Sequence, residues 1–100
     1  MVVERWTFQV KPGCQEEVVK TLREDIVWNP VFDRAYRIYV PFIGPQGVVV
    51  VEWEYQDLQE MEACWAAWRA KRATAEFFEK WHAWTERGGQ REFWELAAAR

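Results

Sequence analysis

The sequence predicts one small α+β domain in which helices cover one face of a four-stranded antiparallel sheet. Residues 2–10 alternate cleanly between apolar and polar side chains, which is the two-residue period of a half-buried strand. Residues 34–55 read as two strands joined by the hairpin loop Gly-Pro-Gln-Gly. Apolar side chains at helical spacing follow the first and the third of these strands. With a last strand at 91–96, the order β-α-β-β-α-β is that of a ferredoxin-like sandwich.

The composition fits a single folded domain that binds neither nucleic acid nor membrane. Half of the 100 residues are hydrophobic and 17% are aromatic, which disfavours disorder. The net charge of −3 and the scattered basic residues argue against a nucleic-acid surface. No signal peptide is visible, and no apolar run reaches the roughly 20 residues that cross a bilayer. We therefore expect a cytoplasmic protein, in which Cys14 and Cys64 are free thiols.

The first strand and the first helix follow from residues 2–26. One face of the strand carries Glu4 at its start and then apolar side chains (Val2, Trp6, Phe8 and Val10). The other face carries Val3, Arg5, Thr7 and Gln9. After the break at 11–13, we expect a helix from about Cys14 to Asp25 or slightly beyond. It stops before Trp-Asn-Pro (28–30), because Pro30 disfavours the helical conformation at Asn29.

Residues 34–43 form the second predicted strand. Its apolar face holds Tyr36, Ile38, Val40 and Phe42. Pro41 cannot donate to a strand ladder, so we expect this strand at an edge or with a bulge. On the third strand, 48–55, the more apolar set is Val49, Val51, Trp53 and Tyr55. That choice leaves Glu52 and Glu54 together on the opposite face.

The second helical region begins at Asp57, an N-cap whose capping box is completed by Glu60. An apolar stripe follows at i, i+3, i+7 and i+10: Leu58, Met61, Trp65 and Trp68. The polar residues 69–74 indicate a kink or break. A second stripe follows, made of Phe77, Trp81 and Trp84 with Phe78 and His82 on its flank. We expect Gly88 and Gly89 to end this helix.

The sheet face away from the helices predicts a homodimer. That face should hold Arg5, Thr7, Gln9, Arg37 and Tyr39 together with Glu52 and Glu54. Cross-strand pairs Arg5–Glu52 and Arg37–Glu54 become possible. Such a face is too polar for a core and too apolar to lie comfortably in water. We expect a second copy of the same sheet to cover it.

These elements resemble the dimeric α+β barrel superfamily, which contains antibiotic-biosynthesis-type monooxygenases, haem-degrading enzymes and NIPSNAP-like proteins. The resemblance rests on VVERWTFQVKPG, RIYVPFIGPQGVVVVEWEY, DLQEMEACWAAW, FFEKWHAW and REFWEL, nearly the whole chain. It implies two sheets packed face to face into a barrel, commonly with a ligand cavity in each protomer. Haem-degrading members place an aromatic residue four positions before a haem-ligating histidine, as Phe78 and His82 do here. Their first-strand asparagine is missing from positions 4–9, which argues against haem degradation and leaves a haem-binding protein as a further alternative. We expect no cofactor.

The candidate site residues divide into two groups. As acids or bases we name His82, Glu52 and Glu54. As substrate-binding residues we name Arg5, Thr7, Arg37, Tyr39, Trp65 and Trp68, with the arginines suited to an anion. Each group has a structural alternative: salt bridges for Glu52 and Glu54, an exposed helical position for His82, and core packing for the tryptophans. One histidine and no paired cysteines predict no metal site.

Two hypotheses remain open for the function. In the first, the homodimer binds a small, partly apolar molecule in a cavity between sheet and helices, and acts as a cofactor-independent monooxygenase or an isomerase-like enzyme. There Glu52, Glu54 or His82 removes a substrate proton and Arg5 or Arg37 stabilises the anion. In the second, the protein is a non-catalytic dimeric module for ligand binding or assembly, whose charged face sets pairing specificity.

Overall fold

The computed structural model describes residues 1–26, 34–71 and 73–100 and confirms the predicted α+β sandwich. Helix α1 continues into one π-helical turn, and the second helical region is broken into two helices. The elements are β1 (Val2–Val10), α1 (Gln15–Thr21), its π-helical turn η1 (Leu22–Ile26), β2 (Tyr36–Tyr39), β3 (Val48–Tyr55), α2 (Leu58–Arg69), α3 (Ala73–Trp84) and β4 (Thr85–Glu95).

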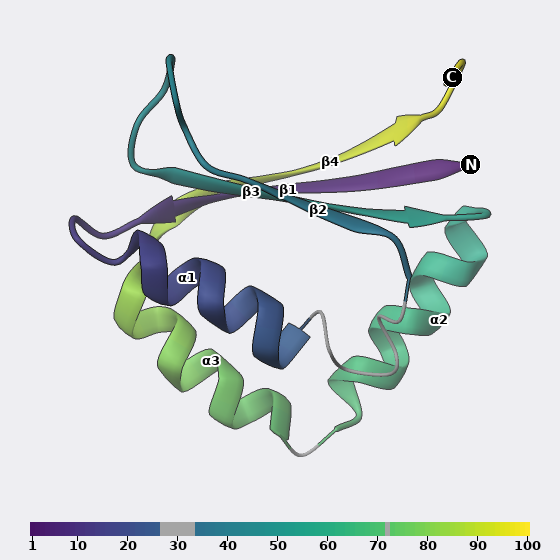
Figure 1. Cartoon of the computed structure of the whole chain (residues 1–100). Coiled ribbons are helices and arrows are strands. Elements are labelled where there is room, and N and C mark those ends of the chain that lie inside the picture. Colours follow the sequence, from purple (N-terminus) through teal and green to yellow (C-terminus); the bar gives the residue numbers. More distant parts are fainter. Residues whose placement is uncertain (27–33, 72) are drawn as a thin grey trace.

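The four strands form one antiparallel sheet in the order β2-β3-β1-β4. Strand β2 lies at an edge, as Pro41 predicted. Helices α1, α2 and α3 lie beneath one face of this sheet (Figure 1). On the other face the β2–β3 hairpin and the C-terminal end of the chain rise from opposite ends of the sheet (Figure 1). The two layers thus leave one sheet face uncovered within the chain.

The core lies between the sheet and the helices, and the predicted faces of β1 and β3 are confirmed. Burial alternates along β3, where every second side chain is buried: Val49, Val51, Trp53 and Tyr55. The helices contribute Val18, Leu22, Met61, Trp65, Trp68, Phe77 and Trp81. Their rings pack mainly edge to face, as in Trp53–Trp65 and Trp65–Trp68, where the ring centroids lie 5.8 and 5.3 Å apart. Such aromatic pairs add to the stability that burial supplies.

The predicted cap of α2 is confirmed, with one difference in its second hydrogen bond. The Asp57 carboxylate accepts a hydrogen bond from the backbone N–H of Glu60 at 2.8 Å. The Glu60 carboxylate reaches back to the backbone N–H of Gln56, also at 2.8 Å, rather than to that of Asp57. The Arg34 guanidinium donates to Glu60 Oε1 at 2.5 Å. These hydrogen bonds join Gln56 and the cap of α2 to Arg34, which precedes β2.

Strand β2 is shorter than predicted, and three of the residues expected beneath the helices are exposed: Tyr36, Val40 and Phe42. The strand ends at Tyr39, so Val40 and Phe42 do not pack beneath the helices. Phe42 is 93% exposed. Pro41 has no backbone N–H for a ladder hydrogen bond, which explains why pairing stops just before it. The predicted helix stop at 28–30 lies outside the described residues.

The prediction that Gly88 and Gly89 end a helix is wrong. Helix α3 ends at Trp84 and β4 begins at the next residue, so both glycines lie inside the strand. The register between β1 and β4 shifts between Thr7 and Gln9, beside these glycines. A Cβ at Gly89 would lie 2.7 Å from the Thr7 carbonyl oxygen. The glycine is therefore required for close approach of two strands at a bulge.

Candidate functional site

An aromatic cavity lies between the sheet and the helices α2 and α3. Its volume is about 570 Å³. Side chains of β1, α2 and α3 supply most of its walls: Trp6, Phe8, Trp65, Phe77, Phe78, Trp81 and His82. The start of β4 adds Thr85, Glu86 and Arg87. A cavity with apolar walls and a few polar groups is typical of a small-molecule site.

One wall of this aromatic cavity carries a buried hydrogen-bond donor. The indole Nε1 of Trp6 is buried and has no hydrogen-bond partner among the described residues. The Trp6 ring stacks on Phe8, 5.6 Å between centroids, and meets Trp65 at 6.2 Å. A buried N–H without an acceptor costs free energy, which an oxygen of a bound molecule or a water would recover. Because this nitrogen has no exposed surface, a ligand oxygen reaches it only after neighbouring side chains shift, and Trp6 can then orient the ligand.

A buried carboxylate holds the inner wall of the cavity in place. Glu4 of β1 is fully buried, and its Oε1 accepts hydrogen bonds from Tyr55 at 3.0 Å and from Trp65 Nε1 at 2.6 Å. Its Oε2 accepts from Nε and Nη2 of Arg91, at 2.7 and 2.6 Å. These four donors satisfy the carboxylate and keep its charge balanced by a guanidinium.

Arg91 lies between aromatic rings on the same side of the sheet. Its guanidinium carbon is 5.1 Å from the ring centroid of Trp6, 5.7 Å from that of Trp65 and 4.8 Å from that of Phe93. Contacts of this kind are favourable between a cation and a ring face. Arg91 thus connects the Glu4 carboxylate with two rings that line the aromatic cavity.

Tyr55 serves this network as a hydrogen-bond donor. Burial raises the pKa of its phenol above the usual value, and the neighbouring Glu4 charge and hydrogen bond raise it further. The phenol therefore stays neutral and donates to Glu4 throughout the physiological range.

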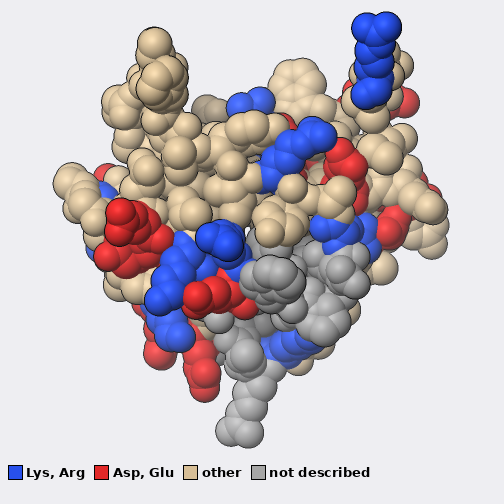
Figure 2. All heavy atoms as spheres, viewed as in Figure 1, with Lys and Arg blue, Asp and Glu red and all other residues tan. Residues whose placement is uncertain are grey.

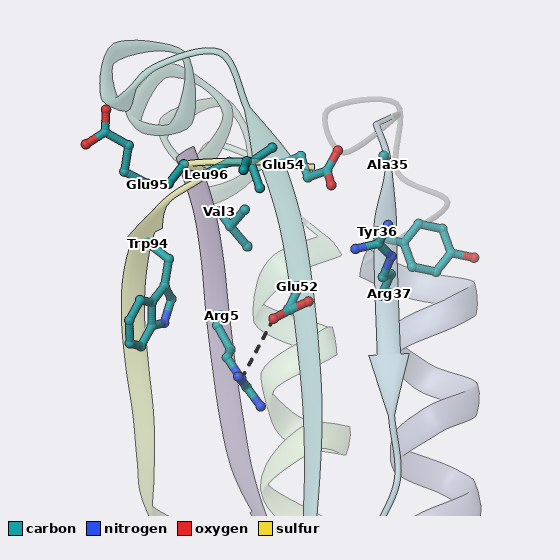
Figure 3. A pocket seen from close by; sticks show the side chains of 12 residues that line it. Val3, Arg5, Ala35, Tyr36, Arg37, Glu52, Glu54, Trp94, Glu95 and Leu96 are labelled. Carbon is teal, nitrogen blue, oxygen red and sulfur yellow. Dashed lines mark ion pairs between the residues drawn. The ribbon is translucent and has the colours of Figure 1, made fainter. Parts of the chain in front are cut away.

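The opposite sheet face holds most of the other predicted site residues. Arg5 lies across from Glu52 in register, with Nε 3.9 Å from Oε2, so the predicted pair is confirmed (Figure 3). Arg37 lies across from Glu52, not Glu54, so the predicted Arg37–Glu54 pair is wrong in register. Tyr39 donates its hydroxyl hydrogen to Glu52 Oε1 at 3.1 Å. Glu52 is therefore the centre of the polar contacts on this face.

The sheet separates the predicted site residues into two groups. His82 and Trp65 line the aromatic cavity, whereas Trp68 is buried in the core against Phe77. Six others lie on the uncovered face: Arg5, Thr7, Arg37, Tyr39, Glu52 and Glu54. Within one chain His82 and Glu52 thus do not share a pocket.

Sequence reasoning missed the roles of Glu4 and Arg91. A signal existed, because Glu4 is the charged residue on the otherwise apolar face of the first strand. Its partner depended on the β1–β4 register, which places Glu4 opposite Phe93 and Trp6 opposite Arg91. Among the described residues no group of three or more His, Cys, Asp or Glu side chains is arranged to hold a metal ion. In the same part of the chain, no helix has the length and apolarity needed to cross a membrane.

Solved structures that share this fold include NIPSNAP proteins and a putative antibiotic biosynthesis monooxygenase. An uncharacterised NIPSNAP domain protein of Burkholderia xenovorans is 21% identical, with a TM-score of 0.81 over 98% of this chain and 96% of that one. A NIPSNAP family protein of unknown function from Agrobacterium tumefaciens is 18% identical, with a TM-score of 0.83 over 97% and 88%. A putative antibiotic biosynthesis monooxygenase of Nitrosomonas europaea is 14% identical, with a TM-score of 0.69 over 98% and 100%.

These similarities confirm the fold that the resemblance predicted. The solved structures that share the fold include NIPSNAP domain proteins and a putative antibiotic biosynthesis monooxygenase, the two groups named in that resemblance. No family model and no curated protein matches the sequence. At identities this low, shared fold is what the comparison establishes.

Proposed function

We propose that this chain, which has the fold of NIPSNAP domain proteins and antibiotic biosynthesis monooxygenases, is a homodimer that binds a small, partly apolar molecule in its aromatic cavity. The observation that carries the proposal is the cavity itself, about 570 Å³ in volume and lined chiefly by aromatic rings. The unpartnered Trp6 Nε1 supports it, because a bound acceptor would satisfy a donor that is otherwise buried without one.

The residues of this cavity support a proton-transfer role for His82. It lines the cavity together with Arg87 and Glu86. Its imidazole can act as a general base towards the hydroxyl group of a bound phenol or a similar acidic group. The guanidinium of Arg87 then stabilises the resulting anion. An electron-rich anion of this kind can react with oxygen directly, without a cofactor. The Nitrosomonas protein of the same fold is described as a putative antibiotic biosynthesis monooxygenase.

The homodimer is supported by the uncovered sheet face. Two cavities lie on it, of about 680 and 530 Å³, and both are lined by a mixture of charged and apolar side chains. The apolar walls include Tyr39, Ile43 and Trp94, all strongly exposed in the single chain. A second sheet packed on this face would cover these side chains and close both cavities.

A non-catalytic binding module is the second candidate. It is favoured by the position of Glu52 and Glu54, which lie across the sheet from His82. The carboxylates of Glu52 and Glu54 are then out of reach of a ligand in the aromatic cavity, and the charged face serves assembly alone.

Binding of 1-naphthol, followed by tryptophan fluorescence quenching, tests the cavity. We expect saturable binding that His82→Gln weakens by less than about threefold, because the imidazole adds one neutral hydrogen bond. Trp6→Phe removes the buried donor and should weaken binding by about tenfold. Glu52→Gln, on the opposite face, is the matched control and should bind 1-naphthol as the wild type does. If Glu52→Gln abolished binding and Trp6→Phe left it intact, the ligand would bind on the uncovered sheet face and not in the aromatic cavity.

Oxygen consumption with a panel of phenols separates the two candidates. If the protein is a monooxygenase, at least one phenol gives oxygen uptake that His82→Gln abolishes while binding persists. If oxygen uptake persists in His82→Gln, His82 is not the base. Binding without uptake for every phenol favours the non-catalytic module.

A further inference from the structure

Four charged side chains form a row that crosses all four strands on the uncovered face. The strand registers place Arg37 of β2 opposite Glu52 of β3, Glu52 opposite Arg5 of β1, and Arg5 opposite Glu92 of β4. Figure 3 shows the Arg37, Glu52 and Arg5 members on adjacent strands. We call these four residues the charge row. Its signs alternate from edge to edge: plus, minus, plus, minus.

The members of the charge row are loosely paired within the chain. The distance from Arg5 Nε to Glu52 Oε2 is 3.9 Å, which is too long for a hydrogen bond. That Arg5 Nε is buried and has no hydrogen-bond partner among the described residues. The Arg5 side chain as a whole is 42% exposed. The partly exposed Arg5 side chain is therefore open to a charged group above the sheet.

The rows on either side of the charge row carry little charge. Towards the hairpin, the register gives Tyr39, Val50, Thr7 and Gln90, all uncharged. Towards the C-terminus, it gives Glu54, Val3 and Trp94, and the backbone N–H of Glu54 donates to the Ala35 carbonyl at the β2 edge. Charge is thus concentrated in one line across the middle of the face.

An alternating row of four charges is complementary to itself only when its order is reversed. Two sheets packed face to face are related by a two-fold axis between them, and aligned packing allows two directions for that axis. An axis parallel to the strands lays β2 over the partner's β4, so Arg37 meets Glu92 of the partner subunit. It also sets Arg5 over Glu52 of the partner subunit. All four contacts then join opposite charges.

The other axis direction gives the opposite result. An axis that runs across the strands lays each strand over its own copy, so Arg37 would face Arg37 of the partner subunit and Glu52 would face its own copy. Four like-charge contacts would result, and such contacts at an interface select strongly against an arrangement.

We propose that the partner of the uncovered face is a second copy of this chain. The two-fold axis that relates the two copies runs parallel to the strands, and the charge row selects this arrangement. The inference rests on the proposed homodimer and specifies its geometry. The side chains in the row of Glu54, Val3 and Trp94 fit this arrangement, because the large, exposed Trp94 then covers the small Ala35 of the partner subunit. Edge strands β2 and β4 of different chains lie together in this dimer.

A charge-inverted chain tests the proposal. The variant Arg5→Glu, Arg37→Glu, Glu52→Arg, Glu92→Arg reverses every sign in the charge row, so it remains complementary to itself. It is repelled by the wild type, because the facing charges are then alike. We mix and incubate a mass-labelled wild-type chain with the inverted chain and count homodimers and heterodimers by native mass spectrometry. We expect about tenfold less heterodimer than random exchange gives.

The outcomes separate this inference from the homodimer on which it rests. An excess of heterodimer means that the axis runs across the strands, and random exchange means that the charge row does not choose partners. Either result overturns the inference and leaves the homodimer standing. If the wild-type chain stays monomeric at micromolar concentration, both the homodimer and the inference about its axis are overturned.

A second variant covers the case in which the four-residue variant does not fold. Exchange of the central pair, Arg5→Glu with Glu52→Arg, gives the order plus, plus, minus, minus, which is again complementary to its own reverse. Against the wild type it makes two attractive and two repulsive contacts. We expect it to form homodimers and to exchange with the wild type less than randomly; random exchange overturns the inference here too. Circular dichroism of each chain alone verifies folding.

Discussion

Glu4 and Arg91 form an ion pair in which the carboxylate is fully buried and the guanidinium side chain is 38% exposed. The pair joins the inner strand β1 to the edge strand β4, beneath the face that the helices cover. Because Glu4 also accepts from Trp65, the same carboxylate fixes a ring of the aromatic cavity. Stability and the shape of the proposed site therefore depend on one buried charge.

Loss of Arg91 should destabilise the protein strongly. In Arg91→Met the Glu4 carboxylate keeps its two neutral donors but loses its counter-charge. We expect a loss of about 3 kcal/mol, the lower end for a broken buried pair, because Arg91 is partly exposed. Urea denaturation measures it. Arg69→Met, at an exposed position on α2, is the control and should change stability by less than about 0.5 kcal/mol. Similar losses for both variants would contradict the role of the pair.

Tyr55 should make the protein lose stability at alkaline pH. Its pKa is raised in the folded chain, chiefly by burial and then by Glu4. As the pH rises above the unfolded value of about 10, the unfolded chain loses the phenol proton first, so the free energy of unfolding falls. Below that value this contribution is fully present. Urea denaturation between about pH 9 and 11 should show a steeper decline for the wild type than for Tyr55→Phe. Parallel declines would refute this assignment.

Gly89 should be more sensitive to a methyl group than its neighbour. The Cβ of Gly89→Ala would meet the Thr7 carbonyl oxygen at 2.7 Å, so the β1–β4 pairing must shift. We expect a loss of about 3 kcal/mol, the upper range for an overpacked site. The Cβ of Gly88→Ala would make only an ordinary contact with Gln9 Cγ at 3.8 Å, but the φ of 104° is strained, and the change should cost about 1 kcal/mol. Thermal unfolding of both variants checks the order, which the reverse ranking would contradict.

The tip of the β2–β3 hairpin should contribute to the dimer and not to the fold of one chain. Phe42 and Ile43 are 93% and 90% exposed, and Figure 2 shows this hairpin projecting as a prong without charged atoms. Replacing both with serine should leave the urea denaturation of the monomer at low concentration unchanged. We expect the dimer dissociation constant to rise by about tenfold, because two apolar side chains lose their cover. If sedimentation equilibrium shows no change in the dimer dissociation constant, the hairpin is not part of the interface.

Addition of haem should give no shift of the Soret band. Phe78 and His82 have the four-residue spacing of haem-degrading proteins, and their rings lie 5.9 Å apart between centroids. The asparagine that such proteins carry on the first strand is absent. An absorbance titration of the wild type beside His82→Ala makes the test. A Soret shift in the wild type that His82→Ala loses would show haem ligation and require a different function.

The element order and the faces of the strands were predictable because both follow from local periodicity. The alternation along β1 and β3 places Trp6 and Val51 under the helices and Arg5 and Glu52 on the uncovered face, as observed. Asp57 was recognised as a cap because a cap is defined by neighbours three residues apart. The charge pair Arg5–Glu52 could be named as one possibility among several.

The ends of β2 and β4 were predicted less well, because strand length depends on which strand lies alongside. Local signals placed Val40 and Phe42 in a strand, but pairing with β3 ends at Tyr39. Gly88 and Gly89 resemble a helix terminator in the sequence. They lie in β4 because pairing with β1 supplies hydrogen bonds for that segment and the bulge needs a residue without a Cβ.

The sequence by itself determined the sandwich, its buried face and the charged character of the other face, since each depends on spacing along one segment. Tertiary structure decided which residues are brought together. Glu4 pairs with Arg91, Glu52 lies opposite Arg37 in register, and His82 lines the same cavity as Trp6 but not as Glu52. The physical reason is register. A shift of one residue between two strands leaves every propensity unchanged, yet it turns each side chain towards a different partner and a different face.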